Sequence, residues 1–462
     1  MYGKSLNRQA VIVAGGKGTR LKALLGELPK AMIPIGGKPL LEHQIELARR
    51  HGFTDILVLA GHRAEAIAAY CGDGSRWGVR LECRREAQPL GTAGAVAAAF
   101  DRLEEQFVVL YGDEMANVDL GRLWDAHVAA RAEATLVLHP NDHPLDSDLV
   151  EVNAAGWITA FHNRPHPPGA YFQNLVNAAL YVVSKPALRP WARAPQKMDF
   201  GKDLFPAMLR RGAKLLGYRS PEYIKDVGTP ERYQSVCAEC AAGVVERSSL
   251  GWPQSAVFLD RDGTLNRETG GVTAPDQLEL LPGVAEAIRE LNHEGLRAVV
   301  ITNQPLVAKG FCSEADLQLI HNKLETLLGR EGAFLDRIYY CPHHPEKGFP
   351  GERPELKVDC ACRKPKPGLI HQAAQELNLD LRASWLIGDS TRDLETARQA
   401  GLRSILVRTG YAGRDGRFNA QPDYAADTLA EAVRFIVAAR TRQGGQKKSL
   451  RKRATGATNR AS

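Results

Sequence analysis

The sequence predicts an α/β protein in which two doubly wound domains follow one another. The first observation is a series of short, continuous apolar runs, each typical of a strand covered on both faces of a parallel sheet. The second is that segments with helical spacing separate these runs. The third is that the series ends near residue 240 and a second series begins near residue 254. An alternation of strands and helices that restarts once indicates two sheets, each flanked by helices.

The predicted strands fall in order along the chain. The first series reads AVIVAGG, DILVLAG, FVVLYGD, ATLVLHP and NAALYVVS. The second series reads SAVFLDRDG, RAVVITNQ, RIYYCPHH, SWLIGDS and RSILVRTG. Between them, AAGVVERSSLGWPQS changes from a helical pattern to Ser, Gly and Pro. We therefore predict a first domain over 1–240, a linker over 241–253 and a second domain over 254–440.

Composition excludes several classes of protein. The chain has 462 residues, of which 44% are hydrophobic and 24% charged, so it is expected to fold into globular domains rather than remain disordered. No apolar run of about 18 residues occurs, and the first residues do not have the layout of a secretory signal. We expect a cytoplasmic protein without membrane contact, whose cysteines are reduced. Cys237 and Cys240, on a predicted helix, are interpreted as packing residues.

The net charge of +7 has a local origin. Residues 441–462 contain seven lysines and arginines and no acid, so the remainder of the chain is close to neutral. We interpret this stretch as a disordered, solvated tail. Contact with nucleic acid is the alternative interpretation and is disfavoured. No feature of the sequence indicates an oligomeric state.

The first domain opens with a strand followed by a glycine-rich turn. Such a turn allows backbone N–H groups to approach phosphates closely, and nearby cations neutralise phosphate charge. The residues concerned are Gly15, Gly16, Gly18, Thr19, Arg20 and Lys30. The pattern predicts a site for a nucleoside triphosphate.

The segments LPK and IPIGGKP follow this turn, and together they resemble the corresponding region of the sugar-1-phosphate nucleotidyltransferases. The later segments EAQPLGTAGAV, VVLYGDEM, QNLVNAALYVV, FGKDLFPAML and IKDVGTPERY follow in the family's order. The resemblance covers the whole first domain and implies a Rossmann-like fold. It implies that Asp113 and Asp226 hold Mg²⁺ on the nucleotide phosphates. It also implies that the segment from Glu86 to Gly91 helps to form the base pocket and that Asn177 contacts substrate.

In the second domain, Asp260 and Asp262 follow an apolar strand. Two carboxylates placed in this way suit Mg²⁺ binding, attack on a phosphoryl group and proton transfer. Thr302, Lys364 and the pair Asp389 and Asp393 follow in the segments RAVVIT, CRKPKPG and WLIGDSTRD.

Together these four motifs resemble those of the haloacid-dehalogenase phosphatases, which have a Rossmannoid fold. The resemblance implies that Asp260 is the nucleophile and Asp262 the general acid and base. Thr302 and Lys364 would bind the phosphoryl group, with Asn303 and Arg363 contacting substrate. Asp389 would complete a Mg²⁺ site formed with Asp260 and Asp262, the latter through its backbone carbonyl.

A cysteine- and histidine-rich stretch precedes Lys364. Cys341, His343, Cys360 and Cys362 offer four N/S ligands suited to a tetrahedral Zn²⁺ site, which we predict to be structural. His344 is then the spare histidine; reduced cysteines without metal are the alternative. The pattern resembles that of the heptose-1,7-bisphosphate phosphatases and, less closely, that of the histidinol-phosphate phosphatases.

The order of the two reactions links the two domains. Removal of the 7-phosphate from a heptose 1,7-bisphosphate gives a heptose 1-phosphate, which is the substrate class of the first domain. We therefore predict a bifunctional enzyme of nucleotide-activated heptose synthesis that uses heptose phosphates and a nucleoside triphosphate, with GMP transferred from GTP. Two alternatives are kept. One is a histidinol-phosphate phosphatase fused to a transferase for another sugar, and the other is a first domain that senses nucleotide sugars without catalysis.

Overall fold

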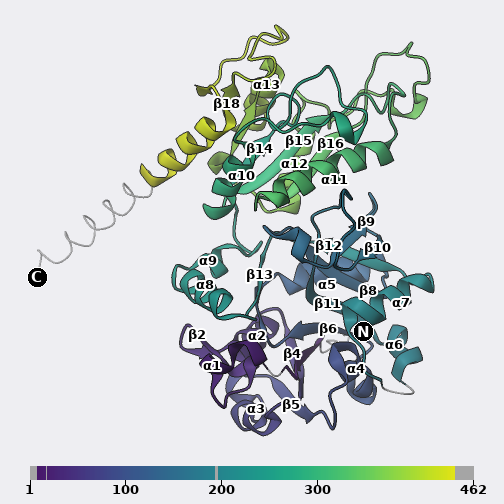
Figure 1. Cartoon of the computed structure of the whole chain (residues 1–462), viewed down its shortest axis with the longest axis vertical. Helices are drawn as coiled ribbons and strands as arrows, with labels where there is room; N and C mark the ends of the chain where they lie inside the picture. Colours follow the sequence, from purple (N-terminus) through teal and green to yellow (C-terminus); the bar gives the residue numbers. More distant parts are fainter. Residues whose placement is uncertain (1–7, 17, 193–195, 443–462) are drawn as a thin grey trace, which may run out of the picture. The chain divides into compact units, whose positions relative to one another are not determined.

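The computed structural model describes residues 8–16, 18–192 and 196–442 (Figure 1). Two compact units divide the chain, one ending at Trp252 and the other beginning at Pro253. The predicted basic tail lies outside the described residues from position 443 onwards. Among the described residues, none of the helices is both long enough and apolar enough to cross a bilayer.

The centre of the first unit is a parallel group of four strands in the order β6-β1-β4-β5. Their bounds are β1 Arg8–Ala14, β4 Phe53–Ala60, β5 Arg80–Arg85 and β6 Gln106–Tyr111. Alternate residues of β1 face opposite cores: Ala10 and Ile12 belong to one apolar cluster, Val11 and Val13 to the other. The continuous apolar run is therefore explained by helices on both faces.

Helices cover the two faces of this sheet in separate groups. One face packs α2 (Leu40–Arg50), α3 (Ala64–Cys71) and α5 (Leu120–Ala130). The other packs α4 (Gly91–Ala98), α6 (Lys185–Ala192) and α7 (Phe205–Arg210). The class predicted from the sequence, α/β with covered sheets, is confirmed.

The remaining strands of the sheet depart from the parallel pattern. β11 (Val176–Ser184) runs antiparallel to both β6 and β8 (Ala134–His139). The chain reaches β11 from β8 through the hairpin of β9 (Leu149–Val152) and β10 (Ile158–His162), without a crossover helix. Parallel neighbours need such a crossover, so this connection reverses the strand direction. β12 (Leu215–Arg219) adds to β8 in parallel.

Short elements surround this sheet. The strand pairs are β2 (Pro34–Ile35) with β3 (Lys38–Pro39), and β7 (Glu114–Asn117) with β13 (Tyr223–Asp226). The helices are α1 (Lys22–Leu25), α8 (Pro230–Ala241) and α9 (Val244–Arg247). Cys237 and Cys240 pack against a small apolar cluster beneath α8, in line with the interpretation as packing residues.

Most of the segment predicted as a linker packs onto the first unit. Val245 of α9 is buried, and its carbonyl accepts a hydrogen bond from Asn117 Nδ2 at 2.8 Å. The backbone N–H of Leu250 donates to Glu222 Oε1 at 2.7 Å. The short helix and this buried carboxylate anchor the chain as far as Leu250.

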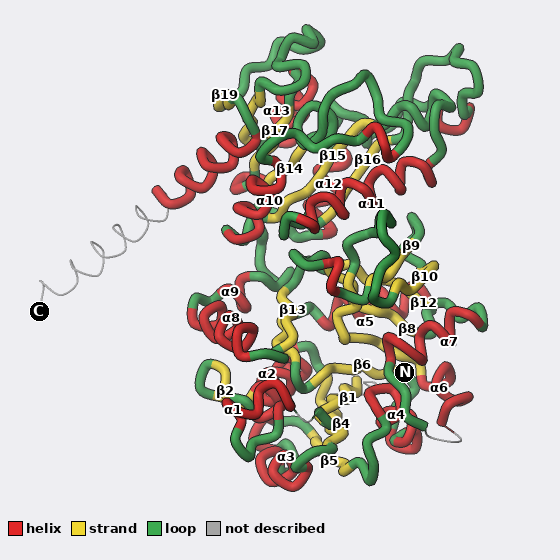
Figure 2. Tube along the Cα trace, in the orientation of Figure 1, coloured by secondary structure: helices red, strands yellow, loops and turns green. Residues whose placement is uncertain are grey.

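The second unit contains a six-stranded, entirely parallel sheet in the order β16-β15-β14-β17-β18-β19. The strands are β14 Ala256–Leu259, β15 Arg297–Asn303, β16 Arg337–Cys341, β17 Trp385–Gly388, β18 Arg403–Val407 and β19 Tyr424–Ala426. The helices drawn red in Figure 2 include α10 (Val284–His293) and α11 (Glu314–Arg330) against one core, and α12 (Gly368–Glu376) and α13 (Thr391–Ala400) against the other. All five predicted strands of this unit are present.

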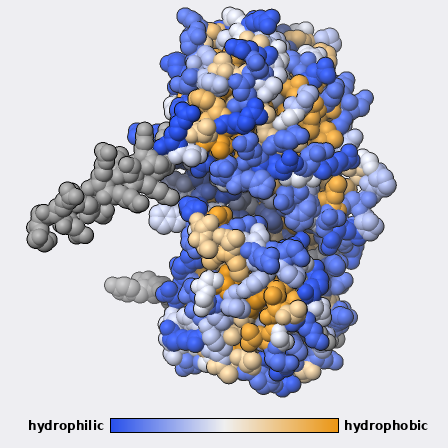
Figure 3. Space-filling model, turned by 60° about the vertical axis from the view of Figure 1, so that its left-hand side comes forward, coloured by the Kyte–Doolittle hydropathy of each residue, from blue (hydrophilic) through white to orange (hydrophobic). Residues whose placement is uncertain are grey.

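Hydrophilic residues predominate on the face drawn in Figure 3, and apolar residues gather there in small patches. The exposed large apolar side chains are scattered along the chain, among them Leu24, Leu28, Trp252 and Phe311. Scattered apolar side chains are ordinary on protein surfaces.

Candidate active sites and metal cluster

The glycine turn after β1 is closely packed in the first unit. A Cβ at Gly15 would lie 2.7 Å from Glu86 Oε1, so the turn and the segment after β5 meet only because no side chain separates them. Gly18 has φ +59°, and a Cβ there would lie 2.6 Å from Leu25. Thr19 and Arg20 follow in the first turn of a 3₁₀ helix, Thr19–Leu21. Gly15, Gly16 and Glu86 are thus brought to the carboxyl edge of the sheet, where open α/β sheets bind ligands.

Two carboxylates converge on one buried lysine. Lys30 Nζ lies 2.7 Å from Asp113 Oδ2 and 3.2 Å from Asp226 Oδ1, and only 7% of the residue is exposed. Asp113 follows β6 and precedes β7, and Asp226 ends β13, whose antiparallel pairing with β7 places Asp226 opposite Glu114. Burial opposes the charge of Lys30, but the two carboxylates outweigh it and raise the pKa of the lysine. Paired carboxylates beside a fixed cation suit Mg²⁺ and phosphate binding.

Two residues of this site were missed from the sequence. Glu114 is directly adjacent to Asp113, and its pKa is raised well above its usual value by burial and then by Asp113 and Asp226. Arg232 Nη1 donates to Asp226 Oδ2 at 2.9 Å. Arg20 also lies near Asp226. A Cβ at Gly228 would be 2.4 Å from Asp226 Oδ2 and 3.0 Å from Arg20 Nη2. The signals in the sequence were an acid directly after Asp113 and an arginine six residues after Asp226.

Gly91 and Asn177 belong to a different part of this unit. Gly91 begins α4 with φ +72°, and a Cβ there would lie 2.5 Å from the carbonyl oxygen of Met198. Asn177 Nδ2 lies 2.8 Å from the position of a Cβ at Gly201. Asp199 joins these segments by accepting a hydrogen bond from Thr92 Oγ1 at 2.8 Å. The turn around Asp199 therefore connects the segment after Glu86 with β11.

In the second unit, four charged side chains lie together at the carboxyl edge of the sheet. Lys364 Nζ is 2.9 Å from Asp260 Oδ2 and 2.6 Å from Asp393 Oδ1, and all three side chains are buried. Asp389 joins the two aspartates in a group whose carboxylate oxygens lie within 4.8 Å of one another. The pKa of Asp260 is raised to about 6 by burial and by Asp393, and that of Asp389 to about 8 by burial and by Asp260.

These raised pKa values test whether a cation fits the cluster. Three buried carboxylates face Lys364, and Arg392 acts on two of them, so negative charge still exceeds positive charge in a site of low dielectric. Carboxylate oxygens are the ligands that Mg²⁺ prefers, and Asp260 and Asp389 of this group are two of the predicted ligands. Asp393 was not among the predicted ligands, and its oxygens have other partners: Oδ2 accepts from Ser390 Oγ at 2.6 Å, and Oδ1 pairs with Lys364. It therefore holds the lysine in place.

The side chain of Asp262 does not join this cluster. Arg261, fully buried, donates through Nη2 to both carboxylate oxygens of Asp262 at 2.9 Å. Gln304 Nε2 donates to Asp262 Oδ2 at 2.8 Å and to Thr302 Oγ1 at 2.9 Å. Burial opposes ionisation of Asp262, but Arg261 and its other donors outweigh it and lower the pKa. Arg261 and Gln304 were missed, although both lie within quoted motifs.

Two further predicted residues fix the backbone around Lys364. Asn303 Nδ2 donates to the Lys364 carbonyl at 3.1 Å, and the Lys364 N–H donates back to Asn303 Oδ1 at 3.0 Å. Arg363 Nη1 donates to the carbonyl of His343 at 3.1 Å. Arg392, missed from the sequence, acts electrostatically on Asp260 and Asp393, and its buried Nε has no hydrogen-bond partner among the described residues. Arg392 is therefore a second cation beside these two aspartates.

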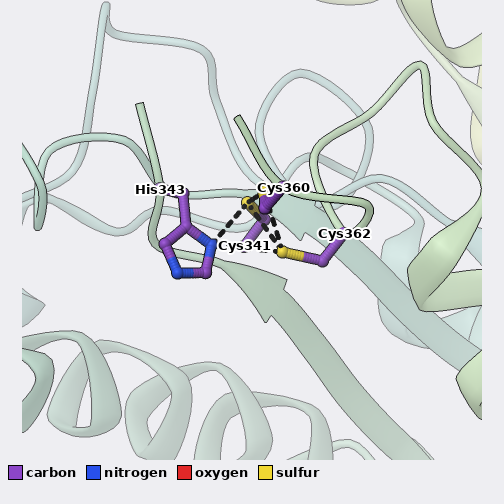
Figure 4. Close-up of side chains that lie close together, drawn as sticks. All are labelled: Cys341, His343, Cys360 and Cys362. Carbon is purple, nitrogen blue, oxygen red and sulfur yellow. Dashed lines mark hydrogen bonds between the residues drawn. The ribbon is translucent and has the colours of Figure 1, made fainter. Parts of the chain in front are cut away.

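The four predicted zinc ligands come together (Figure 4). Cys362 Sγ lies 3.2 Å from Cys341 Sγ, 3.1 Å from Cys360 Sγ and 3.2 Å from His343 Nδ1. Tetrahedral ligands about 2.3 Å from a zinc ion would be roughly 3.7 Å apart, which this cluster reaches with a small expansion. The pKa of Cys362 is lowered to about 5, first by the Cys341 thiol, so a thiolate is already favoured. His344 instead contacts the carbonyl of Glu346 and the ring of Phe349.

Comparison with known proteins assigns the two halves of the chain. The model of the nucleotidyl transferase family matches residues 9–242, and the chain belongs to this family. A HAD-hydrolase-like model matches residues 361–432. The chain is 40% identical over 191 residues to the D-glycero-D-manno-heptose-1,7-bisphosphate 7-phosphatase of Thermosynechococcus vestitus, covering 40% of this chain and 96% of the relative. It is 42% identical over 186 residues to the D-glycero-beta-D-manno-heptose-1,7-bisphosphate 7-phosphatase of Haemophilus ducreyi, covering 40% of this chain and 98% of the relative.

These relatives place the second half in the family of heptose bisphosphate phosphatases. A solved structure, HddC from Yersinia pseudotuberculosis complexed with GMP-PN, is 24% identical and has a TM-score of 0.44. The matched region covers 50% of this chain and 99% of the HddC chain. That likeness is too weak to indicate a function.

Proposed function

We propose that this chain is a bifunctional enzyme of nucleotide-activated heptose synthesis. The second unit removes the 7-phosphate of D-glycero-D-manno-heptose 1,7-bisphosphate, and the first unit transfers GMP from GTP to the resulting heptose 1-phosphate. The observation that carries the proposal is the buried group of Asp260, Asp389 and Asp393 around Lys364, in a region about 40% identical to heptose bisphosphate phosphatases. The proposed substrates, a sugar bisphosphate and a nucleoside triphosphate, support a cytoplasmic location.

In the phosphatase reaction, a carboxylate oxygen of Asp260 attacks the phosphorus, and the bond from phosphorus to the C7 oxygen breaks. Asp262 supplies a proton to that oxygen, and water then hydrolyses the phosphoaspartate to inorganic phosphate while Asp262 takes a proton from the water. Lys364 and Thr302 hold the phosphoryl oxygens. A bound Mg²⁺ would neutralise phosphate charge at Asp260, Asp389 and the Asp262 carbonyl. Proton donation requires Asp262 to turn away from Arg261, which keeps it ionised in the described conformation.

In the transferase reaction, an oxygen of the heptose 1-phosphate attacks the α-phosphorus of GTP, and pyrophosphate leaves. No protein nucleophile is required, so positioning and charge compensation supply the catalysis. Lys30 and Arg20 offset the charge of the phosphates, and the turn at Gly15 and Gly16 admits them close to the backbone. Asp113 and Asp226 would hold Mg²⁺, which compensates the charge on the leaving group.

The alternatives make different substrate predictions. A histidinol-phosphate phosphatase would have the same chemistry with another leaving alcohol. A non-catalytic first unit is disfavoured because Lys30, Asp113 and Asp226 already form a joined cluster. The relative from Haemophilus ducreyi is named for the β anomer. We propose the α anomer here, because the coupling of a 7-phosphatase with a guanylyl transfer resembles the route to GDP-heptose.

The test is a phosphate-release assay on the purified chain with the α and β bisphosphates and with histidinol phosphate, followed by each nucleoside triphosphate in turn. We expect preferred turnover of the α bisphosphate and formation of GDP-heptose with GTP. Preference for histidinol phosphate would refute the assignment of the phosphatase substrate. Absence of a nucleotide sugar with every triphosphate would refute the proposed transferase.

A further inference from the structure

A pocket of about 400 Å³ lies in the second unit, away from the aspartate cluster. It is lined by Ser255, Asp380, Arg382, Ala383, Arg403 and Arg440. Ser255 precedes β14, and Arg403 is the first residue of β18. In contrast, Asp260 and Asp389 follow the carboxyl ends of β14 and β17. Because all strands of this sheet are parallel, the pocket lies at the edge opposite the catalytic carboxylates.

Three arginines from three different elements line this pocket. Arg382 belongs to the 3₁₀ helix Leu381–Ala383, Arg403 begins β18, and Arg440 lies in the helical segment 429–442. Within the described parts of the chain, none of the three forms an ion pair with a carboxylate. The single acid of the lining, Asp380, accepts a hydrogen bond from the backbone N–H of Arg382 at 3.0 Å. The lining therefore carries an excess of positive charge, which Asp423 and Glu294 offset in part by acting on Arg403 and Arg440. Arg440 Nη1 also donates to the Glu294 carbonyl at 3.2 Å.

Arg403 is held in a fixed orientation. Its guanidinium lies 3.9 Å from the ring centroid of Trp385, its neighbour in the parallel pair of β17 and β18. Its Nε is buried and has no hydrogen-bond partner among the described residues. A buried donor of this kind costs about 1–3 kcal/mol unless water or a ligand satisfies it. Burial also lowers the pKa of both Arg403 and Arg440, which indicates that their charges lack full solvation.

We propose that this pocket binds a small phosphate-bearing anion with two or three negative charges, such as pyrophosphate or the diphosphate of a nucleotide. The planar fork of arginine matches phosphate oxygens in a bidentate manner, and three forks from separate elements can surround one diphosphate. The volume falls within the range of small-molecule sites and leaves space for an organic group beside the phosphates. Binding here does not depend on the substrates proposed for either active site.

The location connects the pocket to the phosphatase site through one strand. β17 runs from Trp385, which lies beneath Arg403, to Gly388, and Asp389 follows directly. A bound anion would therefore contact one end of the strand whose other end presents an active-site carboxylate. Asp389 is four residues after Trp385, which in an extended strand is a distance of about 13 Å.

The test is hydrogen–deuterium exchange of the full chain, read by mass spectrometry, with inorganic phosphate, pyrophosphate or GDP as separate probes. This readout is local, so phosphates bound at the two active sites are distinguished from phosphates bound in the pocket. We expect slower exchange in peptides that cover residues 380–385 and 402–405. Slower exchange with all three probes would identify a simple phosphate site. Slower exchange with pyrophosphate and with GDP, but not with inorganic phosphate, would identify a diphosphate site.

The variant pair Arg382→Ala and Arg440→Gln removes two of the three guanidinium groups and leaves the Arg403 stack intact. We expect the half-saturating concentration of the effective probe to rise by at least about tenfold, with both enzymatic activities unchanged. Arg434→Ala is the matched control, since Arg434 is an exposed arginine of the same helical segment. Absence of protection by any probe, or equal protection in the double variant, would overturn the proposal.

Discussion

Replacement of Cys362 by serine tests whether the proposed zinc cluster controls the position of Lys364. Cys362 is two residues from Lys364, and its sulfur contacts the other three members of the cluster. Loss of one thiolate is expected to weaken zinc binding so far that the purified chain contains little zinc. The segment that carries Arg363 and Lys364 then loses its anchor on one side, and its backbone at Lys364 is held by the reciprocal bonds to Asn303.

The expected fall in phosphatase activity can be worked out from the position of Lys364. Lys364 Nζ lies 2.9 Å from Asp260 Oδ2, in a fully buried site. At an effective dielectric constant of about 20, a displacement of about 1 Å lowers this attraction by roughly 1.5 kcal/mol. If the same loss applies to the transferring phosphoryl group, kcat for phosphate release falls about tenfold.

The assay measures zinc per chain by mass spectrometry, phosphate release and nucleotide-sugar formation on one preparation. Cys312→Ser is the matched control, because Cys312 belongs to the same unit and lies outside the cluster. Nucleotide-sugar formation is expected to remain unchanged in both variants. Full phosphatase activity in a zinc-free Cys362→Ser protein would refute the reasoning, and an equal fall of both activities would indicate general unfolding instead.

Other perturbations separate the two sites. Asp260→Asn removes the proposed nucleophile and is expected to lower phosphate release by more than about a thousandfold, while nucleotide-sugar formation from supplied heptose 1-phosphate persists; loss of both would contradict independent sites. Lys30→Met is expected to lower nucleotide-sugar formation by about 10²–10³-fold and to leave phosphate release intact, and an unchanged rate would exclude Lys30 from the site. Chelation by EDTA is expected to stop both reactions, and added Mg²⁺ to restore them; activity that survives exhaustive chelation would count against metal dependence. Burial lowers the pKa of His127 to about 4, so its neutral form is favoured in the folded state, and stability is lost as pH falls from about 6.5 towards 4. This loss amounts to about 2 kcal/mol by pH 5, and thermal melting at pH 7 and pH 5 should show a smaller fall for His127→Gln; equal falls would refute the assignment.

The main parallel strands and the four members of the cysteine and histidine cluster were readable from the sequence, because apolar runs and ligand types mark them. Cys341 ends a strand and Cys360 lies in a later loop, yet the ligand types alone indicated that they meet. The direction of β11 was not readable, because it depends on the hairpin that replaces a crossover helix. The orientation of Asp262 was equally hidden, since an arginine between two aspartates gives no sign that it is buried against one of them.

The segment after Ala241 shows a third limit of sequence interpretation. Ser, Gly and Pro indicate a flexible connection, but Glu222, far earlier in the chain, accepts the N–H of Leu250. A polar partner distant in sequence can turn a stretch with the composition of a loop into a fixed part of a domain. Arg232 and Glu114 were missed for a similar reason, because their importance arises from charges that only the fold brings near.

The cysteine and histidine cluster also has a consequence for sequence divergence in this segment. The residues between His343 and Cys360 leave the cluster and return to it, so their two ends are fixed together whatever lies between them. We expect insertions or substitutions in that stretch to act on the segment after β15, where the Arg353 N–H donates to the Ala308 carbonyl at 3.0 Å, while Lys364 keeps its place. The length and composition of this loop can therefore change with little effect on the position of Lys364.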